Sequence, residues 1–313
     1  MERFDWKMIF KLNLFSLWVV GLWPKGDAYT FNIYTVYAAV SISFFISAFG
    51  ILATINAFKI NSDMDDSEEV IVFFALEVLI NIKVFMFIKN LRLMKQIMTT
   101  LSNDMFQPKC LKQVLLIEPA LNIWRIIYNI LIAIGGPTIT LRMLYPFLTK
   151  SRVLPLPAWY PYNIQISPLY EISFLHQFVT VLYSVVALYN IDMFIIALLV
   201  FVGAQCDIIC DDLRNLNEKN FEIFNNKLIK FVKYHQEIVI LAENFNNSFN
   251  IILLGQFLTS SVVLAFLLYL LAMMCCFQNK NLDVKFISHV VLASFYIVQI
   301  FTYCWLANEM EAK

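Results

Sequence analysis

Long stretches of this chain carry no charged residue and are rich in apolar ones. Neither Thr30 to Phe58 nor Asn244 to Asn279 contains an Asp, Glu, Lys or Arg. A helix needs about 20 apolar residues to cross the hydrocarbon core of a bilayer, and both stretches are longer than that. Of the 313 residues, 60% are hydrophobic and only 15% are charged, which is too few charges to cover a soluble protein of this size. The sequence therefore predicts a multi-pass membrane protein.

Four further apolar runs carry only a few charged residues and are long enough to cross the bilayer. The six predicted spans are Thr30–Phe58, Val70–Ile88, Asn122–Tyr145, Ile172–Cys206, a segment within Asn244–Asn279, and Phe286–Asn308. A backbone inside a bilayer has to satisfy its own hydrogen bonds, which an apolar segment of this length does as a helix. The predicted fold class is therefore an all-α membrane protein, a helical bundle.

The distribution of Lys and Arg between the loops predicts a cytoplasmic N-terminus. Positively charged residues concentrate in the short segments that face the cytoplasm. With the N-terminus inside, fifteen Lys and Arg residues lie in the inner segments. Six lie on the outer side: Lys59, Arg142, Lys150, Arg152, Lys280 and Lys285.

The spans and the segments between them divide the chain into four parts. Residues 1–29 form a cytoplasmic segment in which Lys7 and Lys11 alternate with apolar residues, a pattern that predicts an amphipathic helix on the inner leaflet rather than a cleaved signal peptide. Residues 30–206 hold transmembrane helices one to four. Residues 207–243 form a cytoplasmic helical anchor extension, and residues 244–313 hold helices five and six. The extension carries an apolar stripe, which predicts an assembly surface; the alternative is a solvated helix pair.

No catalytic or cofactor motif is present in the sequence. The chain has no His-Glu-x-x-His zinc motif, no Gly-rich phosphate loop and no Gly-x-Ser-x-Gly elbow. Cys206 and Cys210 are four residues apart without a His nearby, and we interpret them as small residues at a helix end. Basic and acidic residues both number 23, so no net charge favours nucleic acid. We therefore expect no enzyme, no metal, no cofactor and no nucleic-acid partner.

Polar residues inside the spans are candidate sites, because they are costly in a bilayer. Asp192 is interpreted as a hydrogen-bonding partner of a neighbouring helix, with an ion or gating contact as the alternative. Glu77 is placed near the outer mouth, and Lys83 is expected to extend its ammonium group towards the inner surface. His176 and His289 either line a pocket or cap a helix.

Several motifs resemble those of insect odorant receptors and follow one another in that family's order. Gly-Leu-Trp-Pro at 21–24 follows the amphipathic start, and segment 154–162, with Trp159-Tyr160-Pro161, resembles the second outer loop. Ser-Pro-Leu-Tyr at 167–170 and His-Gln at 176–177 come next. The series continues with Tyr-His-Gln-Glu-Ile at 234–238, Gln-Phe-Leu-Thr-Ser-Ser at 256–261 and Thr-Tyr-Cys-Trp-Leu-Ala-Asn-Glu-Met at 302–310. The resemblance covers nearly the whole chain.

The resemblance implies a seven-helix protein with a cytoplasmic N-terminus, unrelated to rhodopsin-like receptors. It implies a nonselective cation channel for smell, in which a divergent odorant-binding subunit assembles with a common co-receptor as a heteromeric tetramer in the plasma membrane of olfactory sensory neurons. Six of the seven expected helices are visible, and we expect the chain to lack the seventh, pore-lining one. The family's subunit anchor projects onto His235, Gln236, Tyr303, Cys304, Trp305, Asn308 and Glu309.

The resemblance also implies an odorant pocket in the outer half of the membrane, among helices two, three, four and six. Its aromatic and aliphatic walls suit a small, volatile, apolar ligand. Projected onto the predicted spans, the ligand-binding residues are Phe73, Phe74, Glu77, Ile134, Thr138, Leu141, Tyr183, Val186, Ala187, Asn190, His289, Phe295 and Tyr296.

Three other classes of membrane protein are compared with this interpretation. A taste receptor of the same superfamily is the nearest alternative, although the outer-loop motif and the Gly-Leu-Trp-Pro start favour the odorant branch. A secondary transporter is expected to show internal repeats and broken helices, and only Gly135-Gly136-Pro137 suggests a break. The cytoplasmic N-terminus disfavours a G-protein-coupled receptor.

Overall fold

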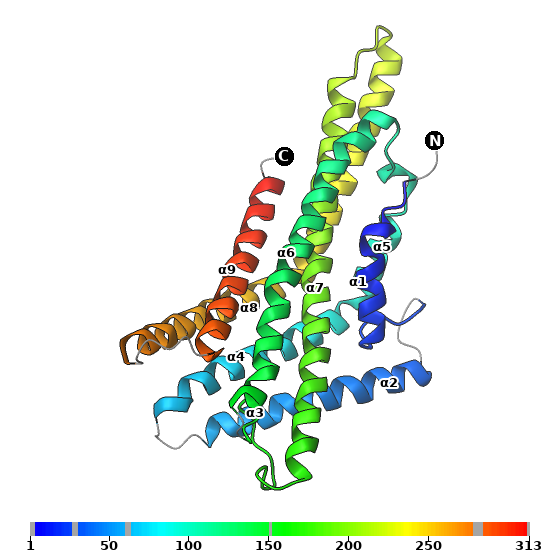
Figure 1. Cartoon of the computed structure of the whole chain (residues 1–313). Coiled ribbons are helices and arrows are strands. Elements are labelled where there is room, and N and C mark those ends of the chain that lie inside the picture. The colour runs from blue at the N-terminus through cyan, green and yellow to red at the C-terminus, as the bar shows by residue number, and fades with distance from the viewer. Residues whose placement is uncertain (1–3, 27–30, 60–63, 150–151, 278–283, 312–313) are drawn as a thin grey trace.

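The computed structural model describes residues 4–26, 31–59, 64–149, 152–277 and 284–311 (Figure 1). Within these ranges the regular structure is entirely helical. Its elements are α1 (Lys7–Val19), α2 (Ile33–Ile42), η1 (Ser43–Ser47), α3 (Ala48–Phe58), α4 (Met64–Lys89), α5 (Leu91–Thr100), η2 (Asp104–Phe106), α6 (Leu111–Thr149), α7 (Leu169–Arg214), α8 (Phe221–Phe277) and α9 (Val284–Glu311).

Six helical segments of the described chain are long and apolar enough to cross a membrane. The first is one continuous helix made of α2, a single π-helical turn η1 and α3; the others are α4, α6, α7, α8 and α9. The prediction of an all-α bundle with six visible spans is therefore confirmed. Of the Lys and Arg residues used to predict the orientation, Arg3, Lys150, Lys280 and Lys313 lie outside the described residues.

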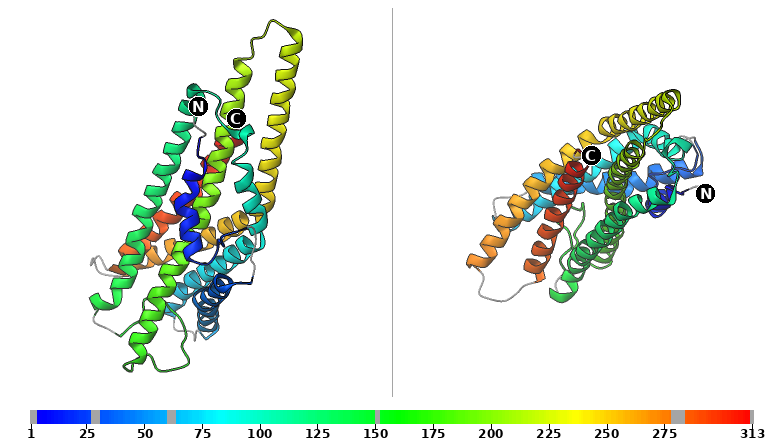
Figure 2. Two further views of the ribbon diagram at one scale, coloured as in Figure 1. Left: turned by 90° about the vertical axis from the view of Figure 1, so that its right-hand side faces the viewer. Right: turned by 90° about the horizontal axis from the view of Figure 1, so that it is seen from above.

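Helices α7 and α8 are much longer than a bilayer is thick. The 46 residues of α7 correspond to about 69 Å at 1.5 Å per residue, against a hydrocarbon core of about 30 Å. The two helices run side by side beyond the rest of the bundle and meet at a short turn, residues 215–220 (Figures 1 and 2). Both helices are therefore long enough to extend past a bilayer, and the cytoplasmic position of residues 207–243 stays a prediction.

The start of α1, the end of α9 and the α7–α8 turn all lie towards one end of the bundle (Figures 1 and 2). The loop between α6 and α7 lies at the opposite end. An even number of spans brings both ends of a chain to the same side of a membrane, so this arrangement agrees with the predicted topology. We call the end that carries the α7–α8 turn the inner end.

Helix α7 forms the centre of the bundle. Every residue from Asn190 to Gln205 is buried, and this stretch is apolar on all sides except for Asn190, Asp192 and Gln205. A helix that is apolar all round is one that its neighbours surround. The rings of Phe194 and Phe201 lie against aromatic side chains from α1, α4, α8 and η2, so the main hydrophobic core is built around α7.

The N-terminal helix α1 packs along α7 rather than standing apart from the bundle. Trp6, just before α1, and Phe10 are fully buried, with their rings 4.7 Å and 5.5 Å from those of Phe201 and Phe194. The other face of α1 is exposed and largely apolar, since Met8, Leu12, Phe15 and Val19 lie on it. The helix thus has one face in the protein core and one apolar face available to lipid.

Ion pairs and hydrogen bonds join the inner ends of α6, α7 and α8. Lys112 of α6 lies 2.7 Å from Asp211 of α7, and Lys109 forms an ion pair with Asp212. On the other side of α7, the Tyr234 hydroxyl of α8 donates to the Gln205 side chain at 2.5 Å. These contacts fix the base of the long helix pair.

Candidate functional site

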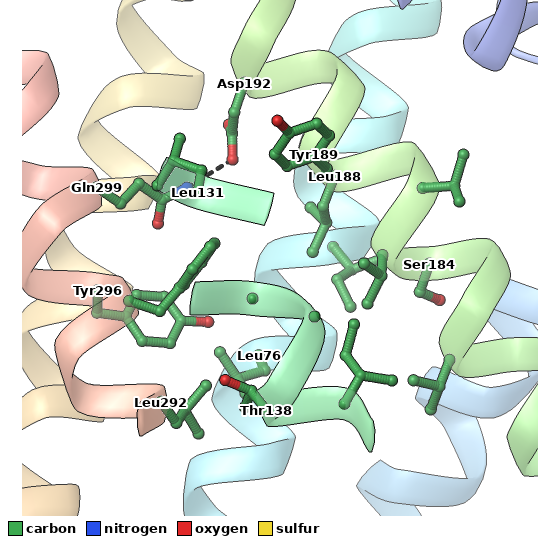
Figure 3. A pocket seen from close by; sticks show the side chains of 18 of the residues that line it. Leu76, Leu131, Thr138, Ser184, Leu188, Tyr189, Asp192, Leu292, Tyr296 and Gln299 are labelled. Carbon is green, nitrogen blue, oxygen red and sulfur yellow. Dashed lines mark hydrogen bonds between the residues drawn. The ribbon is translucent and has the colours of Figure 1, made fainter. Parts of the chain in front are cut away.

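A cavity of about 490 Å³ lies between α4, α6, α7 and α9. Its walls are mainly aliphatic and aromatic, and Figure 3 shows Leu76, Leu131, Leu188, Leu292 and Tyr296 around it. Sites for small molecules in proteins have volumes of about 300–1,000 Å³ and apolar walls with a few polar groups. The cavity has the size and character of a binding site for a small organic molecule.

The outer-loop residue Leu156 covers the cavity on the side away from the inner end. Gln177 of α7 holds it there, because the Leu156 amide donates to the Gln177 side chain at 3.0 Å and the Gln177 amide donates back to the Leu156 carbonyl at 3.1 Å. Both residues are buried. The outer loop therefore has a fixed position over this site.

Arg142 of α6 fastens the same loop to α4. Its Nε donates to the Pro155 carbonyl at 2.6 Å, and its Nη2 forms an ion pair with Glu69. The guanidinium also lies 4.6 Å from the centre of the Phe73 ring, a favourable cation–π distance. Arg142 and Phe73 both line the cavity, so this arginine is a structural part of its outer wall.

A buried polar network crosses the inner side of the cavity and joins four helices. The Lys83 ammonium of α4 lies 2.5 Å from Asp192 Oδ1 of α7, and the two side chains are 1% and 6% exposed. Gln299 of α9 donates to Asp192 Oδ2 at 2.6 Å (Figure 3) and accepts a hydrogen bond of 2.9 Å from Gln256 of α8. Gln256 also donates to Ser260 at 2.8 Å. The charges of Lys83 and Asp192 thus compensate each other.

This network bears on two of the interpretations made from the sequence. Asp192 hydrogen-bonds to a neighbouring helix, as the first interpretation stated. The expectation that Lys83 extends to the inner surface is wrong, because its ammonium group is buried against Asp192. The Asp192 carboxylate on the adjacent helix compensates the charge of the buried ammonium directly, so the Lys83 side chain need not extend to water.

Helices α6 and α9 approach closely where α6 carries two glycines. A Cβ atom at Gly135 would lie 3.3 Å from the Phe295 ring of α9, so a side chain at this position would require the ring to shift by a few tenths of an ångström. A Cβ atom at Gly136 would meet nothing in the described chain within 4 Å, and Gly136 lines the cavity. The close approach of the two helices is found at the first of these glycines.

The structure brings together eight of the thirteen residues predicted to bind the ligand. Those that line the cavity are Phe73, Glu77, Thr138, Val186, Asn190, His289, Phe295 and Tyr296. Phe74, Ile134, Leu141, Tyr183 and Ala187 lie outside its lining. Tyr183 points elsewhere, since its hydroxyl donates to the Val20 carbonyl and, at 3.1 Å, to Ser41.

The prediction from the sequence also omitted many lining residues. Several of them lie three or four positions from a predicted residue, on the same face of its helix. On α4 the lining continues from Phe73 and Glu77 to Leu76, Ile80 and Lys83, a face with the spacing of three and four residues that a helix gives. Extending that spacing from the chosen pair would have found them. The missed residues that line the site on the other helices include Leu131, Ile139, Ser184, Leu188, Tyr189, Asp192, Leu292 and Gln299.

The residues predicted for the subunit anchor lie near the inner end of the bundle and are mostly on its surface. His235, Gln236, Cys304, Trp305, Asn308 and Glu309 are exposed, whereas Tyr303 is buried. Tyr303 packs its ring 6.5 Å from that of Phe257. Six of the seven residues are therefore accessible in this chain, and their role in assembly stays a prediction.

Comparison with known proteins gives consistent similarities. The family model described as 7tm Odorant receptor matches residues 63–313. Odorant receptor Or1 of Anopheles gambiae is 20% identical in an alignment that covers 99% of this chain and 80% of that protein. Odorant receptor 65a of Drosophila melanogaster is 26% identical over 40% of this chain and 31% of its own length.

A solved structure has the same fold. It is the olfactory receptor OR5 of Machilis hrabei in complex with eugenol, with a TM-score of 0.81 and 17% sequence identity, over 97% of this chain and 79% of that one. The structure of the same receptor described without eugenol gives a TM-score of 0.78. At this level of identity the similarity establishes the fold of the chain.

Proposed function

Because this chain belongs to the 7tm odorant receptor family, we propose that it is a subunit that binds small, volatile, apolar compounds and, together with a co-receptor subunit, opens a nonselective cation channel. Its place of action is the plasma membrane of olfactory sensory neurons. The observation that carries this proposal is the apolar cavity of about 490 Å³ between α4, α6, α7 and α9. The eight cavity-lining residues projected from the family are the proposed ligand contacts.

The character of the cavity supports an apolar volatile ligand. Apolar surface that leaves water contributes roughly 25 cal/mol per Å², and leucine, isoleucine and aromatic side chains offer such surface around the cavity. Leu156 lines the site, and the loop that carries it is held by Gln177 and Arg142. The Machilis receptor, which shares the fold, is described in complex with eugenol, and we extend the binding of a small organic molecule to this chain.

The polar network on the inner side of the cavity supports a route from ligand to channel. Lys83, Asp192, Gln299 and Gln256 join α4, α7, α9 and α8 through bonds of 2.5–2.9 Å. A ligand that binds one arrangement of these helices more tightly than another shifts the population towards it. In the proposed mechanism, that arrangement is the one in which the pore of the heteromeric tetramer is open.

The long α7–α8 pair and the inner end of α9 are the proposed contact with the co-receptor. Exposed apolar residues gather there, including Ile223, Val232 and Val239 of α8. Trp305 on α9 is also exposed, and tryptophan is enriched among residues that dominate interface energies. An apolar surface outside the bilayer is stabilised when a partner covers it.

The experiment that tests this proposal is current recording from cells that express the chain, an insect odorant co-receptor, or both. A panel of volatile alcohols, esters, ketones, ethers and hydrocarbons is applied to each. Compounds from the panel are expected to evoke cation currents in cells that express both subunits and in neither of the single-subunit controls. Equal currents with the co-receptor alone, or no current with any compound despite surface delivery of both chains, would contradict the proposal.

A further inference from the structure

From two buried oxygen atoms on residues that line the cavity, we infer that this subunit selects ligands that carry a hydroxyl group, such as volatile alcohols and phenols, over ethers, esters and hydrocarbons of the same size. The inference rests on the proposed function, because it concerns the ligand of the same cavity. The two atoms are Glu77 Oε2 of α4 and Asn190 Oδ1 of α7. Both residues line the cavity, and neither atom has a hydrogen-bond partner among the described residues.

The orientation of the Asn190 amide identifies its free atom as an acceptor. The Asn190 side chain is buried, with 4% of the residue exposed. Its Nδ2 donates to the Val186 carbonyl at 2.8 Å, which fixes the amide so that the oxygen is the atom left over. An amide oxygen only accepts hydrogen bonds. A ligand group that approaches it must therefore donate.

The Glu77 carboxyl offers an acceptor in either protonation state. Glu77 is 7% exposed and forms none of the ion pairs found in the described residues. An ionised carboxyl accepts at both oxygens, and a neutral one still accepts at one of them. Glu77 therefore offers an O–H or N–H donor a partner in an apolar surrounding, where such a bond is stronger than in water.

The lysine and arginine side chains that line the cavity already have hydrogen-bonding partners. The oxygens of Glu77 and Asn190 therefore remain available to a ligand. Lys83 pairs with Asp192, and Arg142 binds Glu69 and the Pro155 carbonyl. Both cations line the cavity, but each already has a carboxylate partner and neither is available to a ligand. A neutral hydroxyl group of a ligand can donate to the oxygens of Glu77 and Asn190 without bringing a further charge into the cavity.

The Ser184 hydroxyl is a further polar group of the cavity lining that can donate to a ligand oxygen. Its Oγ is buried without a partner in the part of the chain that the structure describes, and Ser184 lines the cavity on α7, as Figure 3 shows. A serine hydroxyl both donates and accepts. A ligand hydroxyl can donate to Asn190 or Glu77, whereas an ether or ester oxygen can only accept, for example from Ser184. A ligand without a donor leaves the Asn190 amide oxygen without a hydrogen bond, which lowers its affinity.

The test compares isomers that differ in donor capacity but not in composition, on cells that express the chain with the co-receptor. The pairs are hexanol and methyl pentyl ether, octanol and methyl heptyl ether, and phenylethanol and benzyl methyl ether. The alcohols are expected to evoke half-maximal current at a concentration about tenfold or more below that of their ether isomers, which is the effect of roughly one buried hydrogen bond.

Variants at the two oxygens separate recognition from folding. Glu77→Leu and Asn190→Leu are expected to bring the half-maximal concentrations of each alcohol and its ether isomer to within about twofold of each other, whatever their absolute values. Glu77→Gln keeps an acceptor and is expected to keep the preference. The matched control is Leu292→Ala, an apolar change in the same wall, which is expected to shift both isomers by the same factor. A surface tag measures delivery of each variant.

The outcomes distinguish this inference from the proposed function. Currents evoked equally by alcohols and ethers, or by esters and hydrocarbons but not by alcohols, would overturn the inference and leave the proposed function standing. Variants at Glu77 and Asn190 that shift both isomers equally would do the same. A chain that answers to no compound of the broad panel would overturn the proposed function, and the inference with it.

Discussion

Removing the charge of Lys83 is expected to lower the stability of this chain more than removing any other single charge. In the native structure the ammonium lies 2.5 Å from Asp192 Oδ1, with the two side chains 1% and 6% exposed. The variant Lys83→Met keeps most of the length of the side chain and removes its charge. The Asp192 carboxylate then stays buried with the Gln299 amide as its neutral donor.

The expected magnitude follows from the burial of this pair. Removing one partner of a buried ion pair costs about 3–5 kcal/mol, because the other charge is left uncompensated. At roughly 2 °C per kcal/mol for a chain of this size, the apparent melting temperature falls by about 6–10 °C. Thermal unfolding of the detergent-purified protein, followed by size-exclusion chromatography with fluorescence detection, measures this shift.

Two further variants test the reasoning. Lys83→Met combined with Asp192→Asn removes both charges and keeps an acceptor for Gln299, so it is expected to recover most of the lost stability. The matched control is Lys112→Met, which breaks an ion pair with Asp211 of similar length but involves a lysine that is 64% exposed; it is expected to cost about 1 kcal/mol or less. If Lys83→Met destabilises no more than Lys112→Met, the buried pair does not stabilise the bundle in this way.

Three other variants probe the cavity, the α7 contacts and the inner surface. Gly136→Leu places a side chain where a Cβ meets nothing in the described chain within 4 Å, and is expected to raise half-maximal ligand concentrations about tenfold or more with normal surface delivery. Tyr183→Phe removes the hydroxyl that binds the Val20 carbonyl and Ser41, so thermal unfolding is expected to show a loss of about 1 kcal/mol with an unchanged concentration–response curve. Trp305→Ala removes an exposed aromatic of α9 and is expected to lower co-purification of the co-receptor while the melting temperature of the single chain is retained; unchanged co-purification would exclude Trp305 from the interface.

The fold of this chain could be predicted well because membrane-spanning helices are specified locally. Each needs about 20 consecutive apolar residues, which is visible in one segment without knowledge of the others. The extension of the fourth and fifth helices was also visible, since apolar residues at helical spacing continue past the membrane. Pairings such as Lys83 with Asp192 are different. They depend on which helices become neighbours, and these two residues are 109 positions apart.

The candidate site could be predicted where polar residues mark one face of a helix. On α9, Ser288, His289 and Gln299 lie on the same face as Phe295 and Tyr296, and all five line the cavity. The three residues chosen on this helix all belong to that lining. A polar residue in a span usually faces the bundle interior or a cavity, so the sequence itself indicates how α9 is rotated.

On α7 the polar residues Ser184, Asn190 and Asp192 also line the cavity, but the surrounding apolar residues give a weaker signal. The helix is apolar on nearly all sides and surrounded by others, so hydrophobic periodicity does not fix its rotation. The chosen Tyr183 and Ala187 lie outside the lining, whereas their neighbours Ser184 and Leu188 belong to it. A shift of one residue rotates a helical face by about 100°. That rotation is set by contacts with α1, α2 and α6, which only the assembled structure provides.

An activating compound is expected to occupy the cavity between α4, α6, α7 and α9, and every functional prediction made for this chain depends on that. The most direct test is an electron cryomicroscopy structure of the chain assembled with its co-receptor and saturated with the strongest activator from the panel. We predict ligand density in contact with Leu292 and Phe295, with its polar group towards Asn190 or Glu77. Density for the ligand at any other place on this chain, with this cavity unchanged from the ligand-free assembly, would contradict the proposed binding site.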